Sequence, residues 1–153
     1  EKGDIQNAMM QFQQIVDEYS STPSGHSASF YIGKIHFDKS EYDLALSHFE
    51  RSISRKNNIF LNNAAYSALA EIHANKNQYD EAISFQKKLI DNSSSFLDEA
   101  VSMLKLGKFH LLNGDKEIAK SILQNILDEN PDNQDIKSEA DYLNGLIQTL
   151  GVD

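Results

Sequence analysis

Three histidines occur at equal intervals along the chain, and histidine is both a common metal ligand and an acid–base group. His36, His73 and His110 are 73−36 = 37 and 110−73 = 37 residues apart. A zinc site would need such ligands to converge within a few ångströms. Equivalent side chains on successive helices are separated by roughly 10 Å, about one helix diameter, so the three rings would not meet. We therefore expect each histidine to fill a half-buried place between helices, and we expect no metal site and no cofactor.

Acidic pairs are the other candidates for chemistry. Asp80 with Glu81 and Asp128 with Glu129 fall at expected helix ends, where carboxylates favour capping and solubility. The 153-residue sequence has no cysteine, no Gly-x-Ser-x-Gly, no glycine-rich phosphate loop and no His-Glu-x-x-His. These observations indicate that the chain is not an enzyme.

The charge of the chain excludes two classes of partner. The formal net charge is −9, whereas nucleic-acid binding needs a basic face that neutralises phosphates. An acidic chain is equally unsuited to docking on an anionic bilayer. The longest uncharged helical run, residues 57–70, is interrupted by asparagines and falls short of the ~18–20 apolar residues of a membrane span. We expect no nucleic-acid partner and no membrane insertion by this segment.

The interval of 37 residues is the period of a larger pattern. Small residues recur at this spacing, and so do tyrosines and branched apolar residues. A glycine or alanine at a helix crossing lets two backbones approach closely. A fixed period of this kind indicates an array of helical repeats. The small residues that keep the spacing are Ala8, Ala45, Ala82 and Ala119, and separately Gly33, Ala70 and Gly107.

Three segments resemble the tetratricopeptide repeat (TPR): GKIHFDKSEYDLALSHFERSI, AEIHANKNQYDEAISFQKKLI and GKFHLLNGDKEIAKSILQNIL. A fourth, GDIQNAMMQFQQIV, resembles the second half of that repeat. The resemblance implies an all-α fold, a right-handed α-superhelix of antiparallel helix pairs with about eight helices. TPR arrays are non-catalytic scaffolds for protein–protein interaction, so the resemblance implies a protein or peptide partner.

The repeats are longer than the usual ~34 residues, and the extra residues lie between them, as in SSTPSG, KNNIF and NSSSF. Turns of this style resemble those of bacterial cell-envelope TPR proteins. That group includes outer-membrane assembly lipoproteins, Tol–Pal coordinators and ancillary subunits of the translocon. The likeness implies a place in the periplasm, or a membrane anchor facing it, with the cytoplasm as the alternative.

We expect a single TPR array over residues 1–153. Its parts are the second half of a truncated repeat (1–22), three repeats (23–57, 58–94 and 95–131) and a C-terminal capping helix (132–153). Ser40 and Asn77 are the expected N-caps inside the second and third repeats. Gly114 and Asp115 form the expected turn of the fourth. Because the chain starts halfway through a repeat, we expect it to belong to a larger protein.

The first helices of TPR repeats line a concave groove that holds peptides, and this gives the candidate binding surface. Apolar side chains interleaved with lysine on this face favour a partner with apolar anchors and some acid. The alternative is that Phe30, Phe37, Leu104 and Leu111 pack under neighbouring helices. The expected groove residues are Phe30, Lys34, Phe37, Glu71, Ala74, Leu104, Lys108, Leu111 and Asp141. Phe30, Ser67 and Leu104 interrupt the pattern with which chaperone cofactors grip a C-terminal carboxylate, so we do not expect that mode.

Self-assembly is the alternative function. In a TPR array the apolar face of the first helix packs on a preceding helix, so we expect either chain upstream of residue 1 or a second copy of this chain to cover it. Two copies that paired such faces would form a homodimer by two-fold symmetry. The residues of this face are Ile5, Met9, Phe12 and Val16.

Overall fold

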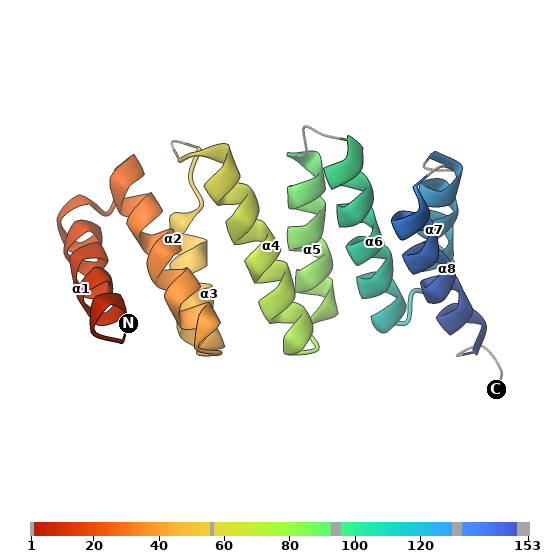
Figure 1. Ribbon diagram of the computed structural model, residues 1–153, viewed down its shortest axis with the longest axis horizontal. Coiled ribbons are helices and arrows are strands. Elements are labelled where there is room, and N and C mark those ends of the chain that lie inside the picture. The colour runs from red at the N-terminus through yellow and green to blue at the C-terminus, as the bar shows by residue number, and fades with distance from the viewer. Residues whose placement is uncertain (1, 56, 93–95, 130–132, 150–153) are drawn as a thin grey trace. The chain divides into compact units, whose positions relative to one another are not determined.

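The computed structural model describes residues 2–55, 57–92, 96–129 and 133–149, and the side chains of these except residues 2, 3 and 96–98. The described residues form eight α-helices and no strand (Figure 1), which confirms the predicted all-α fold. The helices are α1 (Lys2–Tyr19), α2 (Pro23–Asp38), α3 (Tyr42–Ser52), α4 (Ile59–Asn75), α5 (Tyr79–Asp91), α6 (Phe96–Leu112), α7 (Lys116–Glu129) and α8 (Gln134–Thr149).

The helices follow the predicted repeats along the sequence. Helices α2 and α3 lie within 23–57, α4 and α5 within 58–94, and α6 and α7 within 95–131. The boundaries at 94–95 and 131–132 lie outside the described residues. The chain also divides into two compact units, Glu1–Ile72 and His73–Asp153. We call them unit 1 and unit 2.

The connection from α1 to α2 in unit 1 depends on a glycine. The backbone N–H of Gly25 donates to the Thr22 hydroxyl at 3.2 Å, which caps α2, and Pro23 occupies the first turn. A Cβ atom on Gly25 would lie 2.0 Å from the Tyr19 carbonyl oxygen. No side chain fits at that distance, so α1 reaches α2 this closely only because residue 25 is glycine.

Small residues set the helix crossings of unit 1, as the repeat pattern predicts. A Cβ atom on Gly33 of α2 would lie 3.0 Å from the Phe49 ring of α3. Ala45, facing the same crossing, has no exposed surface. On the other side of α2, Val16, Ala28 and Ile32 form a buried cluster. This core is covered by three partly buried residues of α1: Met9, Phe12 and Ile15.

Unit 2 repeats the arrangement with α6, α7 and α8. A Cβ atom on Gly107 would lie 3.3 Å from Leu123, which is again a close crossing. The Gln86 amide of α5 donates to the carbonyl of Ser102 on α6 at 2.9 Å, and both residues are buried. The core cluster of this unit joins α6, α7 and α8 through Ala100, Leu104, Leu123, Ile126, Ile136, Ala140 and Leu143.

The turns inside the repeats correct the predicted caps. Ser40 and Asn77 have φ values of 60° and 57°, and Gly114 has 89°. These residues are 77−40 = 37 and 114−77 = 37 apart, so each repeat places one left-handed residue at the same point. The N-cap positions of α3 and α5 are instead Glu41 and Gln78, without a side-chain capping bond. The prediction of Ser40 and Asn77 as caps was wrong because a chain that reverses this tightly needs a left-handed residue first.

Candidate functional site

The three equally spaced histidines all serve the turn that follows them. Each Nδ1 atom faces a side-chain oxygen five residues later: Glu41 Oε2 for His36, Gln78 Oε1 at 3.0 Å for His73, and Asp115 Oδ2 at 2.9 Å for His110. Because a carboxylate or amide oxygen only accepts, each Nδ1–H is the donor.

Backbone bonds bracket the same turns. The N–H groups of Glu41, Gln78 and Asp115 each donate to the carbonyl oxygen of their own histidine at 2.9 Å. The histidine therefore holds both the backbone and the side chain of the residue that opens the next helix. The sequence signal for this bond is a hydrogen-bond acceptor five residues after each histidine, and the spacing of the histidines alone does not reveal it.

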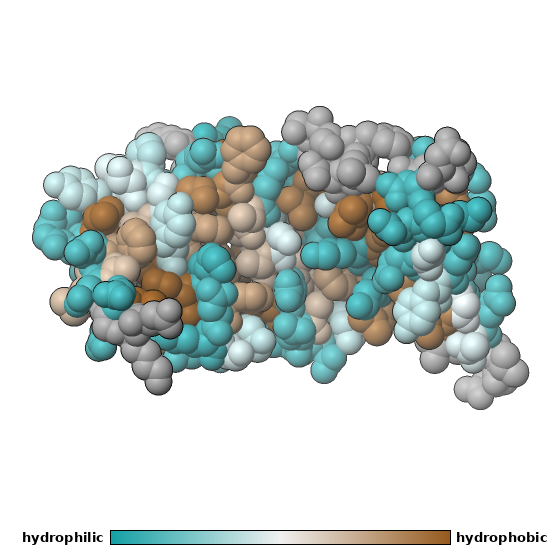
Figure 2. Space-filling model, viewed as in Figure 1, coloured by the Kyte–Doolittle hydropathy of each residue, from teal (hydrophilic) through white to brown (hydrophobic). Residues whose placement is uncertain are grey.

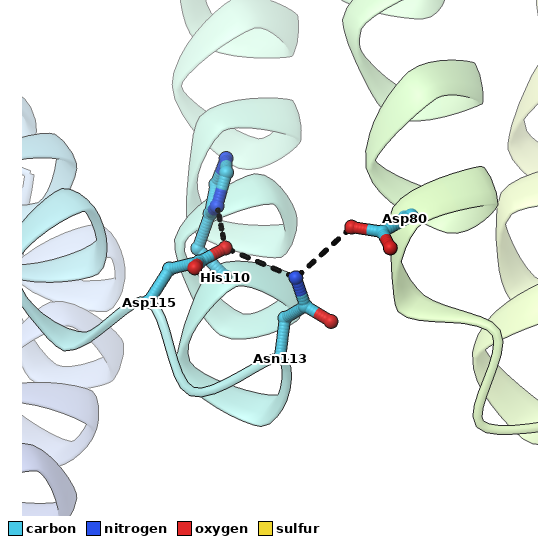
Figure 3. A network of polar contacts seen from close by, with 4 residues as sticks. All are labelled: Asp80, His110, Asn113 and Asp115. Carbon is cyan, nitrogen blue, oxygen red and sulfur yellow. Dashed lines mark hydrogen bonds and ion pairs between the residues drawn. The ribbon is translucent and has the colours of Figure 1, made fainter.

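In unit 2 this turn is also tied to the preceding repeat (Figure 3). The Asn113 amide donates to Asp115 Oδ2 and to Asp80 Oδ1, both at 3.1 Å. Asp80 stands in the first turn of α5, so one side chain bridges two repeats. The hydrogen bonds from His110 and Asn113 lower the pKa of the Asp115 carboxyl below its usual range. Within the described part of the chain, no three His, Cys, Asp or Glu side chains are placed to hold a metal ion.

The apolar members of the expected groove are largely inside the protein. Phe30, Leu104 and Leu111 are only 7%, 8% and 6% exposed, and Phe37 and Ala74 are half-buried. Phe30 packs against Phe49 with ring centroids 5.6 Å apart, and Leu104 belongs to the core cluster of unit 2. The alternative, that apolar side chains of this set pack under neighbouring helices, therefore holds for Phe30, Leu104 and Leu111, and use of the groove by a partner stays a prediction. The expected residues that reach solvent are Lys34, Glu71, Lys108 and Asp141.

A different stripe of α6 carries exposed apolar and basic side chains together. Val101, Lys105, Lys108 and Leu112 are spaced i, i+4, i+7 and i+11, so they lie on one face of the helix. Val101 and Leu112 are 47% and 50% exposed. Neither Lys105 nor Lys108 has an ion-pair or hydrogen-bond partner among the described residues. Tyr142 is exposed on α8, which packs against α6. We call Val101, Lys105, Lys108 and Leu112 the α6 face.

The equivalent stripe in unit 1 is chemically different. Residues 27, 31, 34 and 38, which lie 74 positions before those of the α6 face, are Ser27, Tyr31, Lys34 and Asp38. Lys34 forms an ion pair with Asp38 at 3.1 Å, so its charge is already compensated. Tyr31 is exposed and stacks on Phe12 with centroids 5.2 Å apart. Both aromatic rings line an open cleft of about 340 Å³ between α1 and α2.

Helix α4 is apolar on most sides. Hydrophobic residues gather over it on the face shown in Figure 2. Phe60 is 76% exposed and its neighbour Ile59 is also exposed. An apolar side chain with so much exposed surface is a feature of interaction sites when others lie beside it.

The expected self-assembly face is mostly covered by the chain itself. Val16 is buried against α2, and Met9 and Phe12 are partly buried on the same cluster. Ile5 alone of the four is exposed. The notion that this face lacks a partner helix is therefore wrong for Val16, because α2 of the same chain packs on it. Homodimerisation itself stays a prediction.

Comparison with known families decides the class of protein. Residues 1–121 match the model of the family described as tetratricopeptide repeat-like domain. The chain belongs to this family. TPR domains generally mediate protein–protein interactions and are typically not catalytic, so the coarse prediction of an interaction scaffold agrees with this membership. No curated protein matches the chain.

Solved TPR structures share the fold. One is the C-terminal TPR-containing domain of a Plasmodium falciparum protein assigned as an FK506-binding protein, with 17% identity and a TM-score of 0.62, covering 82% of this chain and 89% of that one. Others are two structures of a Podospora anserina protein assigned as a kinesin light chain with nearly identical TPR-like repeats. They have 16% and 15% identity and a TM-score of 0.70, and each covers 97% of this chain and 82% of that one. At this level of sequence identity, the similarity shows a shared fold and nothing about a shared function.

The finer resemblance to bacterial envelope proteins has no support in these comparisons. The described part of this TPR chain also contains no helix long and apolar enough to cross a membrane.

Proposed function

We propose that this TPR chain binds a protein or peptide partner on the exposed faces of its first helices, and that the α6 face of unit 2 is the main contact. The observation that supports the proposal is the pair of lysines, Lys105 and Lys108, which lack a partner among the described residues and stand between exposed Val101 and Leu112.

The chemistry of this face defines the partner. Two ammonium groups one helical turn apart favour two carboxylates at similar spacing, and the flanking valine and leucine favour apolar anchors. An acidic peptide with apolar residues on either side of its carboxylates satisfies all of these groups.

A displayed library of random peptides, selected on the intact chain, tests the proposal. We expect enrichment of acidic peptides with flanking apolar residues. Two exposed ion pairs together contribute about 0.4–2 kcal/mol, so Lys105→Glu with Lys108→Glu should weaken the binding of a selected peptide by roughly two- to thirtyfold. The matched control is Lys120→Glu with Lys137→Glu, which makes the same change of charge on α7 and α8. If both double variants lose the same affinity for the peptide, or if neither loses affinity, the α6 face is not the binding site.

Homodimerisation is the second candidate. On α1, Ile5 and Met10 are exposed, Met10 by 65%, and Ile5 also lines a cleft with Gln6, Met9 and Lys39. Light scattering over a range of concentrations tests this function. A mass that stays at 17.2 kDa up to millimolar concentration would contradict it.

A bacterial envelope location is proposed only from the long segments between the repeats. Fractionation of the producing cells into periplasm, membrane and cytoplasm tests it. Recovery in the cytoplasm alone would favour the alternative location.

A further inference from the structure

One half-buried repeat position changes from apolar to ionisable in unit 1. Residues 48, 85 and 122 are 37 apart and are His48, Phe85 and Ile122. Phe85 stacks on His73 with centroids 5.5 Å apart and 18° between the planes. His48 stacks on His36 in nearly the same way, at 5.7 Å and 17°. Ile122 packs against the core of unit 2. Unit 1 thus has an imidazole where unit 2 has a phenyl ring or a branched alkyl group.

His48 has no hydrogen-bond partner to support a charge. Its Nδ1 atom is buried and no described residue bonds to it. The nearby carboxylate, Glu41, is engaged by Nδ1 of His36. Arg51, one turn further along α3, places a positive charge close to the His48 ring, in addition to that of His36. A protonated His48 would therefore meet two positive neighbours in a half-buried place.

Several charged groups on the helices around α3 have partners of their own or lie in solvent. On α2, Lys34 and Asp38 pair with each other in solvent, and His26 contacts the Arg51 carbonyl oxygen. On α1, the carboxylates of Asp17 and Glu18 accept bonds from Gln13 and Gln14 of the same helix. The titratable residues of α4 within unit 1 are Tyr66 and Glu71, and Glu71 is exposed. None of these contacts brings an anion to His48.

We propose that the stacked His36–His48 pair is an acid-sensitive lock between α2 and α3. With His48 neutral, its ring packs like Phe85 and holds the two helices together. A proton on His48 places a charge in the packed contact, and unit 1 opens locally. Because α2 carries Tyr31 and Lys34, the lock controls the binding surface of unit 1 without any contact with a partner.

The direction of the pH effect follows from the environment of the ring. Burial, then the positive charges of His36 and Arg51, lower the pKa of His48 below its usual 6.5. A group with a lowered pKa in the folded state contributes stability that is present above pH 6.5 and is lost as the pH falls through the folded value. One proton changes the opening equilibrium by up to tenfold per pH unit within that window.

Hydrogen exchange on the full chain tests the lock, with unit 2 as an internal control. Between pH 7.5 and 5.5, after correction for intrinsic exchange, we expect opening of α2–α3 to increase several-fold and opening of α6–α7 to change little. His48→Phe copies the arrangement of His73 and Phe85, and it should abolish the pH dependence of α2–α3. His48→Gln, whose side chain does not titrate, replaces His48→Phe as the test variant if the phenyl ring does not fit between the helices. Imidazole signals in NMR titrations should show His48 with a pKa below 6.5.

Two results would overturn the proposal. The first is an unchanged pH dependence of α2–α3 in His48→Phe and His48→Gln, which would assign the effect to another group. The second is a His48 pKa at or above 6.5, because protonation would then not oppose the fold. Neither hydrogen exchange nor the NMR titration involves peptide binding at the α6 face. The test of the lock therefore remains valid even if the proposed peptide does not bind.

Discussion

The left-handed residue of each turn offers a quantitative test, because the three repeats fill that position with serine, asparagine and glycine. Ser40 has φ of 60°, a conformation that costs an L-residue about 1–2 kcal/mol. Replacement by glycine removes this cost but adds about 0.4–1 kcal/mol of entropy to the unfolded chain. Ser40→Gly should therefore raise the stability of unit 1 by about 0.5–1 kcal/mol.

The same replacement at Asn77 should gain less. Asparagine tolerates the left-handed region better than serine, and the Asn77 side chain accepts a hydrogen bond from the Tyr79 hydroxyl at 2.8 Å. Loss of that hydrogen bond costs about 0.5–1.5 kcal/mol, which offsets the stability gained when glycine relieves the left-handed conformation. Asn77→Gly should be neutral or slightly destabilising. Gly114→Ala, at φ of 89°, should destabilise unit 2 by about 1 kcal/mol or more.

Thermal unfolding followed by circular dichroism measures all three variants. For a unit of this size, 0.5–1 kcal/mol corresponds to roughly 2–8 °C in Tm. Ser121→Gly on the exposed side of α7 is the control, because glycine inside a helix should lower stability. If Ser40→Gly melts below the wild type, as Ser121→Gly should, the turn does not depend on the left-handed residue and the reasoning fails.

Two further predictions concern the helix crossings and the turn of unit 2. Ala82 is fully buried at the position equivalent to Ala45, so Ala82→Leu should overpack the crossing and cost about 1–3 kcal/mol in urea unfolding; a variant with the wild-type midpoint would show that the repeat register is wrong. Hydrogen bonds from His110 and Asn113 lower the pKa of Asp115. The contribution of this carboxylate to folding stability is therefore present above pH 3.8 and is lost as the pH falls through its pKa in the folded state. Asp115→Asn should therefore flatten the acid unfolding of unit 2 below pH 4, and an unchanged acid limb would contradict this.

The repeat period predicts the helices well because close helix crossings depend on composition. Only glycine or alanine lets two helix backbones cross closely, and at Gly33 of α2 even a methyl group would lie 3.0 Å from the Phe49 ring of α3. Such a residue has few substitutes, so it recurs at each crossing. The turn between the helices is similarly constrained, since one residue must be left-handed.

The binding surface is harder to predict because neighbouring helical stripes differ by one residue. A shift from Leu104 to Lys105 rotates the side chain by about 100° around the axis, which is enough to exchange core for solvent. The stripe 104, 108, 111 and the stripe 101, 105, 108, 112 share Lys108, and both alternate apolar and basic residues. Which stripe faces solvent depends on how α8 packs through Ile136, Ala140 and Leu143, and periodicity alone does not specify that contact.

The repeats are most informative where they differ at a half-buried position. Exposed positions such as 31 and 105 tolerate tyrosine and lysine because solvent accommodates each. A buried polar atom without a partner, like Nδ1 of His48, costs about 1–3 kcal/mol, and Phe85 and Ile122 show that the repeat accepts apolar residues there. Because His48 lowers stability at a position where an apolar residue would fit, its presence needs an explanation other than packing. Sensitivity to acid in unit 1 alone supplies one.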